Sequence, residues 1–224
     1  MLLAIPCVLK ADEVALARSW LADAHFVDGR LSAGLAARRV KRNQELDAGA
    51  PDLERLNRLV MENLVRHPAY RTGALPLHVA SPLYARYQPG ASYGDHLDDP
   101  IMGTDGVMYR SDIAITVFLN PPEEYDGGEL VIRTPFGDQA VKSAAGDAVL
   151  YPASSIHHVN PVTRGERIVA VTWVQSLVRD AARRELLYGL HAAREKLLQS
   201  APDAPETAQV DAAYLNLIRM WSDL

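Results

Sequence analysis

Cysteine is almost absent from this chain: its 224 residues include one, Cys7. No intramolecular disulfide can form, and a single thiol fits the reducing cytoplasm, which is the compartment we predict. Cys7 lies in the apolar run from Leu2 to Leu9. We expect this run to be a first β-strand, with Cys7 as a small buried side chain rather than a catalytic thiol. The run is short and has no basic residues before it, which argues against a signal sequence.

Long apolar segments and an excess of basic charge are also missing. No stretch approaches the ~20 apolar residues of a membrane-spanning helix, so we expect no membrane partner. The net charge is −5 at pH 7. We therefore expect no nucleic-acid partner, because binding a polyanion requires a basic surface. Hydrophobic residues make up 48% of the chain, which is enough to bury a core without disulfides or a structural metal.

The spacing of apolar residues divides the chain into three parts. Residues 1–77 contain the first strand and two helical patterns, expected from Asp12 to about Ala24 and from Pro51 to His67. Residues 78–178 show short β-rich runs between turn residues, which is typical of a β-sandwich or barrel. The runs, the first of which begins just before this part, are Leu77–Ala80, Leu83–Tyr87, Ile113–Leu119, Glu129–Arg133, Ala148–Tyr151 and Ile168–Val174.

Residues 179–224 return to helical spacing. They carry two apolar stripes, Leu186, Leu187, Leu190, Ala193, Leu197 and Leu198, then Val210, Tyr214, Leu217 and Trp221, on either side of Ser200–Pro205. Such stripes must be buried against the barrel, each other or another subunit, so a homo-oligomer and intramolecular packing are equal alternatives. A short basic cluster, Arg38–Arg39–Val40–Lys41–Arg42, is expected to form a solvated face; contact with an anionic substrate is the alternative.

His96 and Asp98 are the first candidates for chemistry. In an extended segment, residues i and i+2 project to the same face, so the imidazole and carboxylate can converge on one metal ion. A second histidine would complete the 2-His-1-carboxylate set that leaves open positions on Fe(II). His157 and His158 both offer it, and adjacent strand residues point to opposite faces, so only one can reach the metal. Alone, His-x-Asp equally fits a histidine hydrogen-bonded to a carboxylate.

The order of the motifs adds to this evidence. His96-x-Asp98 is followed by Tyr125-Asp-Gly-Gly-Glu-Leu130, Gly146-Asp-Ala-Val-Leu-Tyr-Pro152, the histidine pair and Pro161-Val-Thr-Arg-Gly-Glu-Arg167. This arrangement resembles the Fe(II)/2-oxoglutarate oxygenase superfamily. Within it, nearly the whole chain is similar to bacterial PKHD-type hydroxylases, the iron-uptake-associated PiuC/YbiX group. The resemblance implies an α+β fold: a double-stranded β-helix (jelly-roll, cupin-like) core at 78–178, with N-terminal helices in 1–77 and a C-terminal helical extension, 179–224.

The resemblance also implies roles for particular residues. The family's distal histidine precedes by ten residues an arginine that closes a Pro-Val-x-x-Gly-x-Arg segment, which selects His157 over His158 as the third iron ligand. Arg167 then pairs with the C5 carboxylate of 2-oxoglutarate, as a guanidinium fork suits a buried carboxylate. Tyr87 resembles a tyrosine that contacts this co-substrate, although a core role is as well supported. Tyr93 is a weaker candidate.

The implied reaction consumes 2-oxoglutarate and O2, yields succinate and CO2, and hydroxylates a substrate; ascorbate is implied as a cofactor. Asp98 favours hydroxylation over halogenation, because halide-transferring relatives lack the carboxylate. The substrate is unidentified, with a siderophore-related small molecule and a peptidyl target as alternatives. Two rival functions are a cupin oxygenase or isomerase without a 2-oxo acid, and a non-catalytic iron-binding or sensing module. The remaining histidines, His25, His67, His78 and His191, and the tryptophans Trp173 and Trp221 are expected to be surface or packing residues.

Overall fold

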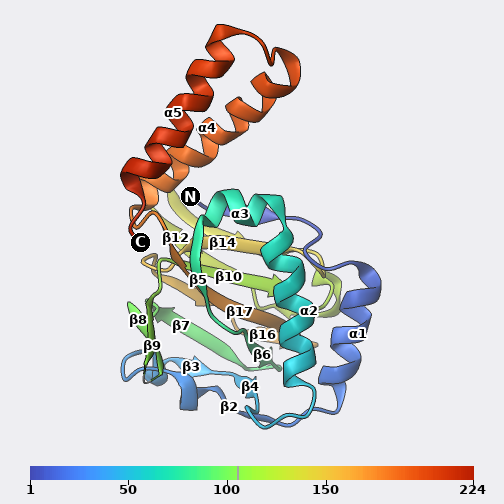
Figure 1. The fold of residues 1–224 in the computed structure, drawn as a ribbon. Helices are drawn as coiled ribbons and strands as arrows, with labels where there is room; N and C mark the ends of the chain where they lie inside the picture. Colours follow the sequence, from blue (N-terminus) through green and yellow to red (C-terminus); the bar gives the residue numbers. More distant parts are fainter. Residues whose placement is uncertain (105) are drawn as a thin grey trace.

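Two antiparallel sheets face each other in the computed structural model, which describes residues 1–104 and 106–224 (Figure 1). The larger sheet has the order β1 (Leu3–Ile5), β14 (Ala148–Pro152), β10 (Ile113–Phe118), β17 (Arg167–Ser176), β6 (Leu83–Tyr87), β4 (Gln44–Leu46) and β2 (Phe26–Asp28), with β5 (Pro76–Val79) also beside β17. The smaller sheet has the order β13 (Gly137–Val141), β12 (Leu130–Thr134), β15 (His157–Val159), β7 (Ser92–His96) and β3 (Lys41–Arg42). Along the chain the strands from β6 to β17 pass back and forth between the sheets, which confirms the predicted double-stranded β-helix.

The central strand β10 shows why the core forms where it does. All six of its residues are buried, because it lies between β14 and β17 and is covered on both faces. Ile113, Ile115 and Val117 belong to the cluster beneath the helices, whereas Ala114 and Phe118 belong to the cluster between the two sheets. Period-2 alternation thus sends apolar side chains into two separate cores, one on each face of the larger sheet.

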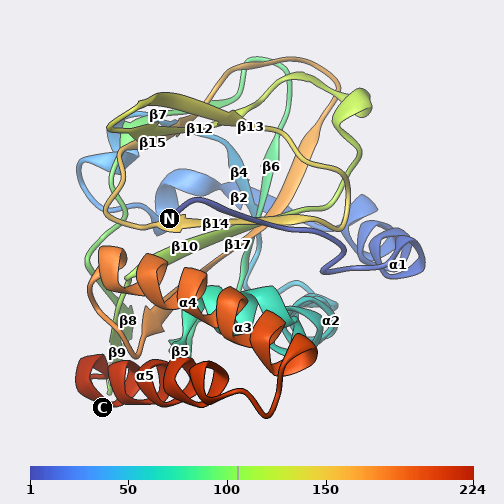
Figure 2. The same ribbon diagram turned by 90° about the horizontal axis from the view of Figure 1, so that it is seen from above.

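Helices α1 (Ala11–Ala22), α2 (Leu53–Arg66) and α3 (Pro68–Ala74) cover the outer face of the larger sheet (Figures 1 and 2). Helix α2 buries Leu56, Val60 and Leu64, which are spaced to lie on one face. It ends at Arg66, before Pro68. The sequence did not predict α3, which starts with Pro68 at its first position and is capped by the His67 imidazole.

Short elements complete the barrel. β8 (Ile101–Thr104) and β9 (Val107–Arg110) form a hairpin between β7 and β10, and β11 (Asp126–Gly127) pairs with β16 (Val162–Arg164). The 3-10 helices are η1 (Gly29–Ser32), η2 (Ala37–Arg39) and η3 (Pro122–Glu124). None of these elements was predicted, because each is too short for its apolar spacing to show.

The C-terminal helices α4 (Ala181–Ser200) and α5 (Pro205–Trp221) form an antiparallel hairpin that extends from one end of the barrel (Figures 1 and 2). Leu187 packs with Leu75 and Val178 at its base, and Tyr214 and Trp221 pack against this cluster. The stripes are therefore partly buried within the chain. Leu186 was expected in the buried stripe but is 65% exposed. No helix among the described residues is both long and apolar enough to cross a membrane.

The expectation for Cys7 was wrong. Strand β1 ends at Ile5, and Cys7 lies in the following turn with an exposed side chain and a φ of 55°. Its N–H donates to the Asp147 carboxylate over 2.9 Å. The chain turns away from the sheet edge directly after Pro6, so the apolar run does not continue as a strand.

Candidate active site

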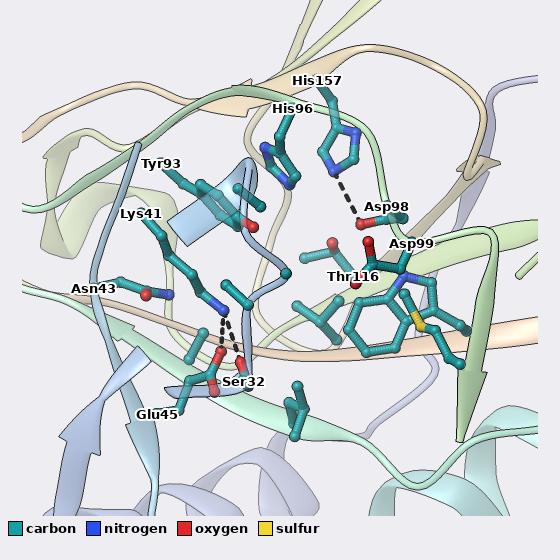
Figure 3. A pocket seen from close by; sticks show the side chains of 18 of the residues that line it. Ser32, Lys41, Asn43, Glu45, Tyr93, His96, Asp98, Asp99, Thr116 and His157 are labelled. Atoms are coloured by element: carbon teal, nitrogen blue, oxygen red, sulfur yellow. Dashed lines mark hydrogen bonds and ion pairs between the residues drawn. The ribbon is translucent and has the colours of Figure 1, made fainter. Parts of the chain in front are cut away.

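A cavity of about 540 Å³ opens between the two sheets (Figure 3). Its lining comes from strands of both sheets, including β6, β7, β10, β15 and β17, from the β8–β9 hairpin and from the segment 32–45, which lies between α1 and α2. It contains all five site residues expected from the sequence: Tyr87, His96, Asp98, His157 and Arg167.

His96, Asp98 and His157 lie together on one side of this cavity. His96 ends β7, His157 begins β15, and the two are paired in register across the smaller sheet. Asp98 follows two residues after β7 ends. One potential ligand atom from each of the three lies within 4.8 Å of the others, and His157 Nε2 is 3.8 Å from Asp98 Oδ1. Residues more than 50 positions apart thus form one compact set of two nitrogens and a carboxylate.

Backbone carbonyls orient both imidazoles. His96 Nδ1 lies 2.9 Å from the Gly94 carbonyl oxygen, and His157 Nδ1 lies 2.9 Å from that of Ser155. Each Nδ1 therefore carries the proton and donates it, which leaves Nε2 as an acceptor on the cavity side. Burial, helped by the neighbouring His157, lowers the pKa of His96 to about 3. The imidazole is thus neutral at physiological pH, as a metal ligand must be.

The surroundings of the Asp98 carboxylate indicate that His96, Asp98 and His157 suit a metal cation. The Oδ2 atom of Asp98 is buried and has no hydrogen-bond partner among the described residues. Burial raises the pKa of Asp98, and the nearby His157 opposes the rise. A buried, unpartnered carboxylate oxygen is costly, and a bound cation would remove that cost. The donor set fits Fe(II), for which two imidazoles and one carboxylate leave positions open.

His158 lies on the opposite face of the smaller sheet. Its Nδ1 is 2.8 Å from Asp95 Oδ1, and the Asp95 carboxylate also accepts a 2.9 Å hydrogen bond from Arg133. His158 does not line the cavity. Strand alternation at β15 therefore directs His157, and not its neighbour, to the other two residues of the set.

Arg167 occupies the cavity at the start of β17, in register with Tyr87 on β6. Its side chain is among the most deeply buried in the protein, with 1% of the residue exposed. The guanidinium carbon lies 4.9 Å from the Tyr87 ring centroid. Burial raises the pKa of Tyr87, and the charge of Arg167 opposes the rise. Arginine and tyrosine therefore present a cation and a neutral hydroxyl in the same interior space.

The guanidinium of Arg167 has no counter-charge in the part of the chain that the structure describes. No carboxylate among the described residues lies within ion-pair distance of it, and none of these residues accepts a hydrogen bond from its Nε. The Tyr125 hydroxyl is likewise buried without a hydrogen-bond partner among the described residues. A buried cation that the protein does not neutralise calls for an anionic ligand.

Two neighbours hold Arg167 in place. The Asn120 side chain donates to the Glu166 carbonyl over 2.6 Å and accepts from the Ile168 N–H over 2.9 Å, so it ties the residues on both sides of Arg167. Gly128, with a φ of 68°, brings the backbone close to the arginine: a Cβ built there would meet Arg167 Cδ at 3.2 Å. The Gly127–Gly128 turn thus leaves room for the arginine side chain.

Tyr93, the weaker candidate, also lines the cavity, and its ring stacks on His96 with a centroid distance of 3.6 Å and an interplanar angle of 11°. Other cavity residues were not predicted as functional. Trp173, expected to be a packing residue, lines the cavity with its Nε1 unpartnered among the described residues. Strand alternation could have identified Trp173 as a cavity residue, because positions 167, 171 and 173 share one face of β17. Lys41, Glu45 and Ser32 also line the cavity.

Arg164 and the remaining histidines lie outside the set of candidate iron ligands. Arg164 is exposed and pairs with Asp126. The imidazole of His67 caps α3, and His78 packs against Tyr109. His25 is an exposed neighbour of Asp47, and His191 lies beside Glu195 on α4.

Comparison with known proteins matches two parts of the chain to families. Residues 82–175 match the 2OG-Fe(II) oxygenase superfamily, and residues 180–223 match the PKHD-type hydroxylase C-terminal domain. A PKHD-type hydroxylase of Thioalkalivibrio sulfidiphilus (strain HL-EbGR7) is 50% identical over 224 residues, and one of Hyphomonas neptunium (strain ATCC 15444) is 47% identical over 225. Both alignments cover 100% of each chain.

Among solved structures, a Pseudomonas putida prolyl-4-hydroxylase is similar with a TM-score of 0.53 at 22% identity. The match covers 78% of this chain and 92% of the other. At this identity the likeness shows a shared fold, and it agrees with the jelly-roll core described above.

Proposed function

This chain belongs to the PKHD-type hydroxylases of the 2OG-Fe(II) oxygenase superfamily. From that premise we propose which of its residues bind the iron and which bind 2-oxoglutarate. Membership makes the protein an oxidoreductase that uses Fe(II) and 2-oxoglutarate, with O2 as co-substrate, to hydroxylate a substrate. In our proposal His96, Asp98 and His157 hold the iron, and Arg167 and Tyr87 hold 2-oxoglutarate. Bound Fe(II) supplies open coordination positions and the redox chemistry of the hydroxylation.

The observation that carries this proposal is the unpaired Arg167. An uncompensated charge in a protein interior costs several kcal/mol, roughly 3–5 by the effect of breaking buried pairs. A dicarboxylate bound at the iron would bring a second carboxylate to this guanidinium and remove the cost. Neither a cupin without a 2-oxo acid nor a simple iron-binding module accounts for a buried arginine at this place.

The protein's own residues prepare the site in three ways. The carbonyls of Gly94 and Ser155 keep both imidazoles in the tautomer that presents Nε2. Tyr87, with its pKa raised by burial, stays a hydroxyl that can donate to the co-substrate. The buried walls of the cavity, among them Tyr151 and Leu130 of the core between the sheets, exclude water from the reacting groups.

Three further assignments belong to this proposal. We assign ascorbate as the reductant of the iron, on family resemblance alone. We assign a cytoplasmic location, supported by the single thiol. We also treat residues 78–178 as the catalytic domain, with 1–77 packed on it and 179–224 as a helical extension; the match of 180–223 to a separate family supports the last boundary.

Succinate formation tests the proposal. Fe(II)-loaded protein is incubated with 2-oxoglutarate, ascorbate and O2, and succinate is measured without any added substrate. We expect slow succinate release by the wild-type protein, its loss in His96→Ala and Arg167→Ala, and its retention in His158→Ala. If Arg167→Ala released succinate at the wild-type rate, Arg167 would not bind the co-substrate. If the wild-type protein bound iron but not 2-oxoglutarate, an iron-binding module would be the better description.

A further inference from the structure

A buried ion pair lies on the cavity wall opposite the three candidate iron ligands (Figure 3). Lys41 Nζ is 2.5 Å from Glu45 Oε1 and donates to Ser32 Oγ over 3.0 Å. Lys41 is 6% exposed and Glu45 is 7% exposed. The sequence prediction of a solvated basic face was therefore wrong for Lys41. Strand β3 pairs Lys41 with Tyr93, which turns Lys41 inward and leaves Arg42 exposed.

A purely structural role does not explain the Lys41–Glu45 ion pair. Taking two charges out of water costs about as much as their attraction returns, so apolar residues of similar size would serve a purely structural role as well or better. The hydrogen-bonding capacity of the pair is also incompletely used. The Lys41 ammonium has three protons and two partners, and Glu45 Oε2 accepts no hydrogen bond from the described part of the chain.

Both residues of the pair line the cavity, and Lys41 lies near the candidate metal centre. Lys41 Nζ lies 5.2 Å from the centroid of the Tyr93 ring, which in turn stacks on His96. One aromatic ring therefore separates the ammonium from the candidate metal centre. Arg167 is already assigned to the co-substrate. Lys41 and Glu45 supply charged groups on the wall across from His157 and Asp98, while Asp99 lines the cavity beside Asp98.

The charges of the pair restrict what it can bind. A substrate carboxylate facing Lys41 would be repelled by Glu45, and a substrate ammonium facing Glu45 would be repelled by Lys41. A neutral group with a donor and an acceptor on one edge satisfies both. The N–H and C=O of one residue in an extended peptide form such an edge, and so does a primary carboxamide. The nearby lining of Leu83, Ala85 and Val171 suits an apolar body attached to it.

We propose that Lys41 and Glu45 bind the primary substrate through an uncharged amide edge, with Lys41 Nζ donating to its carbonyl oxygen and Glu45 Oε2 accepting from its N–H. This assignment rests on the proposed function, because it places the substrate beside the iron. The pair makes specificity contacts and takes no part in the oxidation itself.

The test compares neutral and charged ligands on the full-length protein. Binding is measured by calorimetry, without O2, on protein loaded with Fe(II) and 2-oxoglutarate. The amide probes are N-acetyl-leucine N-methylamide and cyclohexanecarboxamide; the charged probes are free leucine, cyclohexanecarboxylate and cyclohexylmethylamine. We expect at least one amide to bind about tenfold or more tightly than every charged probe, as two well-formed hydrogen bonds would give.

A matched pair of variants separates substrate binding from structure. Lys41→Met/Glu45→Leu removes both charges and should weaken amide binding about tenfold. Arg18→Met/Glu124→Leu removes an exposed ion pair outside the cavity and should leave amide binding unchanged. Amide binding that is the same in the Lys41→Met/Glu45→Leu variant as in wild type would overturn the proposal. The comparison of probes on the wild-type protein needs no variant to fold.

The outcomes also distinguish the source of the amide. Binding of the peptide mimic alone indicates a peptidyl substrate, and binding of cyclohexanecarboxamide alone indicates a small molecule; either supports the proposal. Failure of both amides to bind, or tighter binding of a charged probe, contradicts it. Basal succinate release by the same wild-type sample shows whether the proposed function stands when this inference fails.

Discussion

His157 and His158 are neighbours in β15, yet their imidazoles lie on opposite faces of the smaller sheet. His157 Nε2 is 3.8 Å from Asp98 Oδ1 inside the cavity, and His158 Nδ1 is 2.8 Å from Asp95 Oδ1 outside it. The residue pattern alone could not choose between them. Because the two residues are adjacent but face opposite sides, substituting each in turn tests which one binds iron.

We predict that His157→Ala abolishes stoichiometric Fe(II) binding and that His158→Ala retains it. The first variant removes one of three candidate ligands, and the second removes only a partly exposed contact to Asp95. Anaerobic equilibrium dialysis with iron analysis measures both. Iron binding lost in His158→Ala and kept in His157→Ala would reverse the assignment.

Replacing Arg167 should have opposite effects on stability and on co-substrate binding. Arg167→Met removes a buried charge without a counter-charge, so we expect the protein without 2-oxoglutarate to be at least as stable as wild type. Its affinity for 2-oxoglutarate should fall about 10- to 100-fold, because a charge-assisted bidentate contact is lost. Thermal unfolding with and without 2-oxoglutarate reports both effects. Arg167→Lys should also bind 2-oxoglutarate weakly, because a point charge does not reproduce the fork. Full stabilisation of Arg167→Met by 2-oxoglutarate would contradict the assignment.

The Lys41–Glu45 pair makes a prediction about the free energy of unfolding. Lys41→Met leaves the Glu45 carboxylate buried without its partner, so it should destabilise the protein by about 3 kcal/mol. Adding Glu45→Leu should recover most of that loss, because the remaining charge is then removed as well. Urea unfolding of wild type, the single variant and the double variant measures the difference. A double variant no more stable than Lys41→Met would show that the pair itself stabilises the fold.

Acid should destabilise the metal-free protein through His96. Its pKa of about 3 in the folded state lies below the usual value of 6.5, so the unfolded chain takes up a proton that the folded chain refuses. The contribution is fully present above pH 6.5 and is lost as the pH falls towards 3. Between pH 8 and pH 5 the loss amounts to about 2 kcal/mol. Urea unfolding of wild type and His96→Gln at these two pH values measures it. A pH dependence that is identical in the two proteins would exclude His96 as the cause.

The strands of the core could be predicted from the sequence because their apolar pattern is long enough to read. The expected strand Leu83–Tyr87 has the bounds of β6, and the expected strand Ile113–Leu119 differs from β10 by one residue. Strand β3, with two residues, is defined by its pairing with β7 and carries no periodicity of its own. Tertiary pairing of this kind overrides local pattern.

Tertiary contacts also explain why some features of the candidate site could not be predicted from the local sequence. His96 and Asp98 were identified from their spacing, although β7 ends at His96 and Asp98 reaches the cavity from the loop that follows. Lys41 was placed on a solvated face because its neighbours are basic, whereas its burial depends on Tyr93 and Glu45. Cys7 was expected to be buried because its neighbours are apolar. In both cases the deciding contacts come from residues outside the local segment.

The assignment of the iron and co-substrate sites is tested by an anaerobic titration of the apoprotein with Fe(II) followed by 2-oxoglutarate. The titration is monitored by the visible charge-transfer absorption of iron chelated by a 2-oxo acid. We predict that the band appears in wild type and His158→Ala, is absent in His157→Ala, and requires at least tenfold more 2-oxoglutarate in Arg167→Met. A band of wild-type strength and affinity in both His157→Ala and Arg167→Met would contradict the assignment of the iron and co-substrate sites.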